Sequence, residues 1–78
     1  MPTVLVDGPY SFVFFSSDGG EPPHLHVKRD RHIAKLWLAP ISLAKNRGFP
    51  EHELTHITHL VVKHQQRLLE AWHDYFSS

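Results

Sequence analysis

The sequence predicts an α+β fold: a small curled antiparallel sheet of three to five strands, one face of which is covered by a long C-terminal helix. Two observations predict it. Residues 3–44 contain short runs of β-branched and aromatic residues, separated by turn-forming residues. Residues 50–76 instead repeat apolar residues at helical spacing, with no glycine and no proline after position 50. The two parts can bury their apolar faces against each other.

Turn residues set the bounds of the expected strands. An Asp-Gly-Pro turn follows the first strand, a loop rich in glycine and proline follows the second, and Pro40 ends the fourth. Asp30 and Arg31 leave a tight connection between the third and fourth strands. The expected strands are residues 3–6, 10–16, 24–29 and 32–38, with a short edge strand at 41–44 and a turn at 46–48.

The expected helix spans residues 50–76. Pro50 suits a first helical turn, and Glu51 and Glu53 favour the positive end of the helix dipole. His64 lies at the border of the apolar stripe, where a partly buried histidine usually packs and donates one hydrogen bond. The stripe, which we expect to face the sheet, consists of Leu54, Ile57, Val61, Leu68, Trp72 and Tyr75.

Composition limits the class of protein. A chain of 78 residues, 41% of them hydrophobic, is expected to form one globular domain over residues 1–78 with a modest core. The absence of cysteine excludes disulfides and thiolate metal sites, and it favours a reducing, cytoplasmic location. We expect no secretory signal and no membrane span. Eight basic residues balance eight acidic ones, which argues weakly against non-specific nucleic-acid binding.

His52, Glu53 and His56 fit the H-E-x-x-H zinc-protease pattern, and His59 falls on the same helical stripe. Three imidazoles on one stripe could hold adventitious zinc or nickel. The apolar stripe lies on the opposite side of the helix, however, so these histidines are expected to face water. A chain of this length also has few residues left to wall a protease cleft. The sequence therefore favours a solvated polar face, and no cofactor is expected.

His24 and His26 form the second histidine pair. Strand alternation places both on one face, and the opposite face carries Leu25 and Val27. A two-residue loop after the strand would pair His24 with Trp37 and His26 with Lys35. We expect these four residues to form a binding patch for an anion, a base or a carboxylate. Two alternatives stay open: histidines that satisfy neighbouring groups on a solvated face, and direct metal ligation.

Arg47 is a further binding candidate. It lies between Asn46 and Gly48, just before the expected helix, where a guanidinium could steer an anion towards the helix N-terminus. An ordinary solvated loop residue is the alternative reading. If the protein is an enzyme, which the sequence does not favour, His24 and His26 are the candidate catalytic pair for acid–base chemistry.

Four segments of the chain resemble the small prokaryotic proteins classed as domain of unknown function 4160. The family's recurring Pro-Pro-His-x-His falls on residues 22–26, and the other segments are residues 34–38, 46–49 and 68–73. Some members carry another histidine just before the prolines, where this chain has Gly20-Glu21, which weakens a three-histidine metal site. Genes of this family often neighbour a small partner, so the resemblance implies a toxin–antitoxin-like or prophage module.

Three functions follow as expectations. The first is a cytoplasmic binding or regulatory protein that contacts a small cognate protein from a neighbouring gene. The second is a histidine-dependent, RNase-like toxin or hydrolase that uses His24 and His26, and the third is a metal-binding protein. Homodimerisation and nucleic-acid binding stay open, and no membrane partner is expected.

Overall fold

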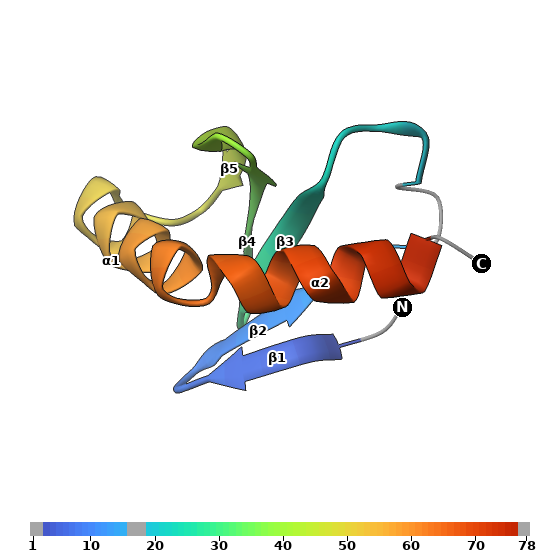
Figure 1. Cartoon of the computed structure of the whole chain (residues 1–78). Coiled ribbons are helices and arrows are strands. Elements are labelled where there is room, and N and C mark those ends of the chain that lie inside the picture. The colour runs from blue at the N-terminus through green and yellow to red at the C-terminus, as the bar shows by residue number, and fades with distance from the viewer. Residues whose placement is uncertain (1–2, 16–18, 77–78) are drawn as a thin grey trace.

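The structure, a computed structural model, describes residues 3–15 and 19–76. Within these residues the chain forms one five-stranded antiparallel sheet in sequential order, followed by two helices (Figure 1). The α+β class and the antiparallel sheet are thus confirmed. The elements are β1 (Thr3–Asp7), β2 (Tyr10–Val13), β3 (His24–Arg29), β4 (His32–Leu38), β5 (Ile41–Arg47), α1 (Glu51–Lys63) and α2 (Gln65–Phe76).

The β3–β4 hairpin has the register that its short loop predicts. Asp30 takes a positive φ of 55°, a conformation that aspartate adopts more readily than most residues. Leu25 lies opposite Leu36, and His26 lies opposite Lys35. The same register places His24 opposite Trp37 and Val27 opposite Ala34. The prediction of one apolar face and one face with histidine, lysine and tryptophan is therefore confirmed.

The two neighbouring strands end elsewhere than expected. β2 ends at Val13, and residue 16, the last of the expected strand, lies outside the described residues. β5 continues to Arg47 rather than stopping at residue 44. The chain leaves the sheet at Gly48, which has a φ of 102°, and the Asn46 side chain holds this turn through hydrogen bonds with the N–H and C=O of Phe49.

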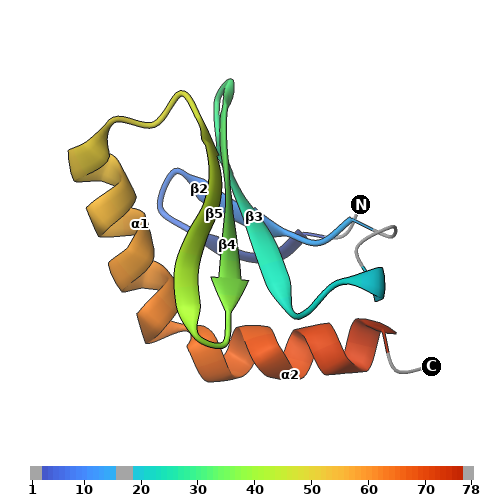
Figure 2. The ribbon, with the colours of Figure 1, turned by 90° about the horizontal axis from the view of Figure 1, so that it is seen from above.

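The expected single helix is not confirmed, because two helices are separated at His64. The His64 backbone leaves the helical region with φ −106° and ψ 11°. Its side chain extends away from the helix, where Nε2 donates a hydrogen bond of 2.9 Å to Asp7 Oδ2 at the end of β1. Figure 2 shows the consequence: α1 runs alongside β5, whereas α2 turns and crosses the end of the sheet where β3 begins and β4 ends.

The core lies between the apolar face of the sheet and both helices. Ile57 and Val61 of α1 and Leu68 of α2 are fully buried. They belong to one cluster with the inward side chains of the strands, which include Phe12, Leu25, Val27, Ala34, Leu36 and Leu38. Ile57, Val61, Leu68 and Trp72 of the predicted apolar stripe are therefore buried, although two helices carry them, whereas Tyr75 at its end is 40% exposed. In residues 3–15 and 19–76, neither helix has the length and the apolar composition needed to cross a lipid bilayer.

Candidate functional site

The face of the sheet opposite the core, the outer face, carries a row of basic side chains. Lys35 of β4 lies between His26 of β3 and Lys45 of β5 in the register, and Arg47 lies opposite Ile33. Successive residues of a strand alternate between faces, so these side chains share one side of three adjacent strands. A hollow of about 370 Å³ opens there, which we call the outer hollow. It is lined by Phe15, His26, Ile33, Ala34, Lys35, Lys45, Asn46 and Arg47.

Lys35 and Lys45 face each other directly across two strands. Like charges at directly opposite positions destabilise a sheet, so this pair is unfavourable for folding alone. Among the residues that the structure describes, no acidic side chain pairs with Lys45 or Arg47, and both are exposed. The outer hollow is consequently electropositive at neutral pH, and a concave basic surface attracts anions.

Lys35 is held more firmly than the other two cations. Its Nζ donates a hydrogen bond of 2.7 Å to Glu21 Oε1 and lies 4.6 Å from the centroid of the Trp37 ring. The Lys35 side chain is only 16% exposed. The ammonium group therefore has a defined position at the border of the hollow, set by one carboxylate and one aromatic face.

His26 and Phe15 supply the aromatic part of the outer hollow. Their ring centroids are 4.4 Å apart, in an edge-to-face arrangement. His26 is half-buried, so part of its ring reaches the hollow. An imidazole beside cationic side chains can donate a hydrogen bond to a bound anion, or can pack against the apolar part of a ligand.

His24, the other histidine of the predicted patch, lies in the interior with 0% of its surface exposed. Its Nδ1 donates a hydrogen bond of 2.9 Å to the carbonyl of Pro22. The His24 ring lies 5.0 Å from the Trp72 ring of α2 and 5.4 Å from the Trp37 ring. Because α2 crosses the end of the sheet, Trp72 reaches the start of β3 and covers this histidine. His24 is thus covered by α2 and does not line the outer hollow, and Trp37 is half-buried beside it.

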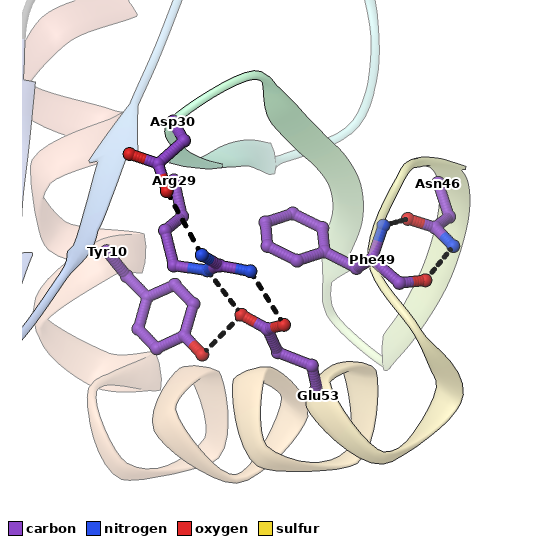
Figure 3. Close-up of polar contacts among 6 residues, drawn as sticks. All are labelled: Tyr10, Arg29, Asp30, Asn46, Phe49 and Glu53. Carbon is purple, nitrogen blue, oxygen red and sulfur yellow. Dashed lines mark hydrogen bonds and ion pairs between the residues drawn. The ribbon is translucent and has the colours of Figure 1, made fainter.

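The glutamate of the H-E-x-x-H pattern is engaged in a polar contact between α1 and the sheet (Figure 3). Glu53 Oε2 accepts hydrogen bonds from Arg29 Nε at 2.5 Å and Tyr10 OH at 2.8 Å, and Oε1 accepts one from Arg29 Nη2 at 2.9 Å. The hydrogen bonds from Arg29 hold the pKa of the Glu53 carboxyl below its ordinary value. Burial, followed by the neighbouring Glu53, raises the pKa of Tyr10. A carboxylate held in this way is poorly placed to act as a general base.

His52, His56 and His59 are exposed, as the helical wheel predicts. The His56 ring lies 5.8 Å from the Tyr10 ring. Within the part of the chain that the structure describes, no three histidine or acidic side chains are grouped so that they could hold a metal ion. The geometry of the pattern therefore gives no support to a zinc-protease site.

The predicted site left out Phe15 and Lys45, which supply an aromatic ring and a cation to the outer hollow, and the lining residues Ile33, Ala34 and Asn46. The alternation of Lys45 with Arg47 was available as a signal, but the Asn-Arg-Gly turn signal ended the expected strand before it. Arg47 was expected before the helix N-terminus; it lies instead in β5, on the outer face. The structure brings together His26, Lys35 and Arg47 of the predicted site, whereas the predicted His24 and Trp37 do not line the hollow.

A scan against protein-family models matches residues 10–73 to the family described as Domain of unknown function (DUF4160). Neither the comparison with curated proteins nor the comparison with solved structures gave a match. The matched segment covers most of the chain and contains every residue that lines the outer hollow. It confirms the resemblance drawn from the Pro-Pro-His-x-His segment. The chain belongs to the DUF4160 family, whose function is unknown.

Proposed function

We propose that this protein is a binding and regulatory module that contacts a small cognate protein through the outer hollow, as one component of a toxin–antitoxin-like two-gene module. The observation that carries the proposal is the direct pairing of Lys35 with Lys45, next to Arg47 on the same face. A binding partner with carboxylates at its contact surface would relieve the repulsion between these cations.

The arrangement of the charges supports binding to a protein. The chain as a whole has a formal net charge of +0 at pH 7, so its basic character is local rather than general. Proteins that bind nucleic acid non-specifically usually carry a broad basic excess. Aromatic residues and arginine are enriched in protein–protein contact surfaces, and the hollow presents Phe15 and Arg47.

An RNase-like activity is the second candidate, and the position of His26 beside Lys35 and Lys45 favours it. Histidine can move protons near neutral pH, and the cations could bind a phosphate. The proposed acid–base pair requires His24 as well, however, and its ring is fully buried. Binding without catalysis is therefore the better-supported function. If the purified chain cleaves RNA and His26→Ala abolishes the cleavage, the RNase-like activity becomes the better-supported function.

The test is co-expression with the product of the neighbouring gene, followed by purification of the complex and calorimetry with the separated proteins. Arg47→Glu should weaken the complex by about tenfold or more, because it replaces a cation of the contact by an anion. Arg67→Glu is the matched control, since Arg67 is an exposed arginine of α2 that does not line the hollow. Lys45→Glu should reproduce the effect of Arg47→Glu.

Two results would contradict the proposal. One is a neighbouring gene product that forms no complex with the wild-type chain. The other is a complex that Arg47→Glu and Arg67→Glu weaken equally, since a general change of charge would then account for both. A complex that loses affinity as salt rises supports the proposal further, because exposed charge pairs are screened.

A further inference from the structure

The border of the outer hollow already contains one carboxylate, that of Glu21. Glu21 Oε1 accepts the hydrogen bond of 2.7 Å from Lys35 Nζ and lies 3.7 Å from His24 Nδ1. The Glu21 side chain is 51% exposed, whereas that of Lys35 is 16% exposed. The anion of this pair is thus in contact with water, and the cation is held in place by the sheet and the Trp37 ring.

We propose that Glu21 occupies, in the free protein, the position that a carboxylate of the partner takes in the complex, and that an acidic side chain of the partner displaces it from Lys35. This inference rests on the proposed binding function and names the chemistry of the bound segment. In the complex, the incoming carboxylate contacts Lys35 together with Lys45, the cation directly opposite it. The Glu21 side chain then turns into the solvent.

The loop that carries Glu21 supports an exchange of side chains without a change of backbone. The carbonyl of Pro22 accepts the hydrogen bond of His24, and the carbonyl of Pro23 accepts one of 3.0 Å from the N–H of Leu38. The chain is therefore anchored directly after Glu21. Release of Lys35 then requires rotation of the Glu21 side chain, and an ion pair whose carboxylate is exposed adds little to stability.

The exchange of Glu21 for a partner carboxylate also explains why Lys35 and Lys45 lie directly opposite each other. With Glu21 in place, Lys35 has its counter-charge, while Lys45 and Arg47 have none among residues 3–15 and 19–76. A carboxylate supplied from outside can lie between Lys35 and Lys45, whereas Glu21 is attached at the Lys35 side. In the free protein, the single Glu21 carboxylate offsets only one of the three cations, so the site still attracts an acidic segment.

The experiment is an NMR titration of the full chain with an acetylated and amidated tetraglutamate peptide at fixed ionic strength. Glu21→Gln should bind the peptide about two- to fivefold more tightly than wild type, because the internal competitor is lost. Asp30→Asn is the matched control: it removes one exposed carboxylate in the same isosteric way, at a residue that does not line the hollow. Asparagine also tolerates the positive φ at this position.

A second pair of variants separates competition from a change in the loop. Lys35→Met removes the shared cation, and adding Glu21→Gln to Lys35→Met should give no gain in affinity. A gain that persists in the double variant would overturn the proposal, because it could not arise from release of Lys35. Equal gains in Glu21→Gln and Asp30→Asn would also overturn it, since net charge alone would then explain both.

The titration also decides the chemistry of the ligand. If inorganic triphosphate gains more from Glu21→Gln than the peptide does, the site takes phosphate and the assignment to a carboxylate is wrong. If neither the wild type nor Glu21→Gln binds the peptide, the proposal that Glu21 is an internal competitor is wrong. The binding function is tested separately by Arg47→Glu in the complex with the neighbouring gene product, so it can survive either result.

Discussion

Glu53 on α1 and Arg29 on β3 form a two-pronged ion pair that ties the first helix to the sheet. Both carboxylate oxygens accept hydrogen bonds from the guanidinium, and Tyr10 of β2 adds a third. The Glu53 side chain is 14% exposed and that of Arg29 is 26% exposed, so the pair is partly shielded from water. Planar, bidentate pairs of this kind are stronger and more directional than single contacts at the surface.

We predict that Glu53→Gln lowers the free energy of unfolding at pH 7. The amide can accept only on one oxygen, so one guanidinium contact loses its acceptor and the remaining one loses its charge. Glu51→Gln is the control, since Glu51 is exposed in the same helical turn. Urea denaturation should place the midpoint of Glu53→Gln clearly below those of wild type and Glu51→Gln. Equal midpoints for the two variants would show that only the helix dipole is affected.

The same contact predicts a dependence of stability on pH. The pKa of Glu53 in the folded chain lies below its ordinary value of 4.5, chiefly because Arg29 donates hydrogen bonds to it. Its contribution to stability is therefore complete above that ordinary value and is lost as the pH falls through the lowered folded pKa. The difference in midpoint between wild type and Glu53→Gln should shrink as denaturation is repeated from pH 7 to pH 3. A constant difference would mean that the carboxylate charge does not stabilise the fold.

His24 and His26 are predicted to have separable roles. His24→Ala should lower the free energy of unfolding by about 2–4 kcal/mol, because it removes a fully buried ring and its hydrogen bond to Pro22. His26→Ala should change stability by only about 1 kcal/mol and should weaken the complex with the neighbouring gene product. Denaturation and calorimetry on both variants check this. A His26→Ala variant that binds normally would remove this residue from the contact.

The register of β3 and β4 was predictable because two residues link the strands, and alternation then fixes every opposite pair. The burial of His24 was not predictable in this way. It depends on α2, which turns at His64 and brings Trp72 over the start of β3. The turn itself leaves no local signal, since apolar spacing continues through it without glycine or proline. Asp7, to which the His64 side chain is hydrogen-bonded at this turn, lies 57 residues earlier in the sequence.

The outer hollow, too, was predictable only in part from the sequence. Strand alternation correctly grouped His26 with Lys35, because both belong to one hairpin. Lys45 joins them only because β5 extends beyond the expected turn, with a register irregularity at Lys35 and Leu36. A side-chain contact, the hold of Asn46 on Phe49, moves the turn to Gly48. Local turn propensity gave the wrong end of the strand because pairing with β4, which continues to Ile33 opposite Arg47, outweighs it.

The contact between Asp7 and His64 is predicted to stabilise the junction of the two helices. The hydrogen bond from His64 holds the pKa of the Asp7 carboxyl below its ordinary value, so the ionised form is the one that stabilises the fold. Asp7→Asn should therefore lower the melting temperature at pH 7 while the helical content at 20 °C stays unchanged. Asp74→Asn, a change at an exposed aspartate of α2, should not lower it. Equal melting curves for Asp7→Asn and wild type would show that the contact does not hold the junction.

The histidines of the H-E-x-x-H pattern are predicted to be unnecessary for both folding and partner binding. Its two histidines and His59 are exposed, and Glu53 is engaged by Arg29 and Tyr10. Replacing the three histidines by alanine should leave the free energy of unfolding within about 0.5 kcal/mol of wild type and should leave the affinity for the partner unchanged. Calorimetry with zinc should give no saturable site in either chain, because exposed imidazoles without a fixed third ligand bind weakly. A one-to-one zinc site in the wild type that is lost in the triple variant would contradict this prediction and would show that the three histidines of α1 bind zinc.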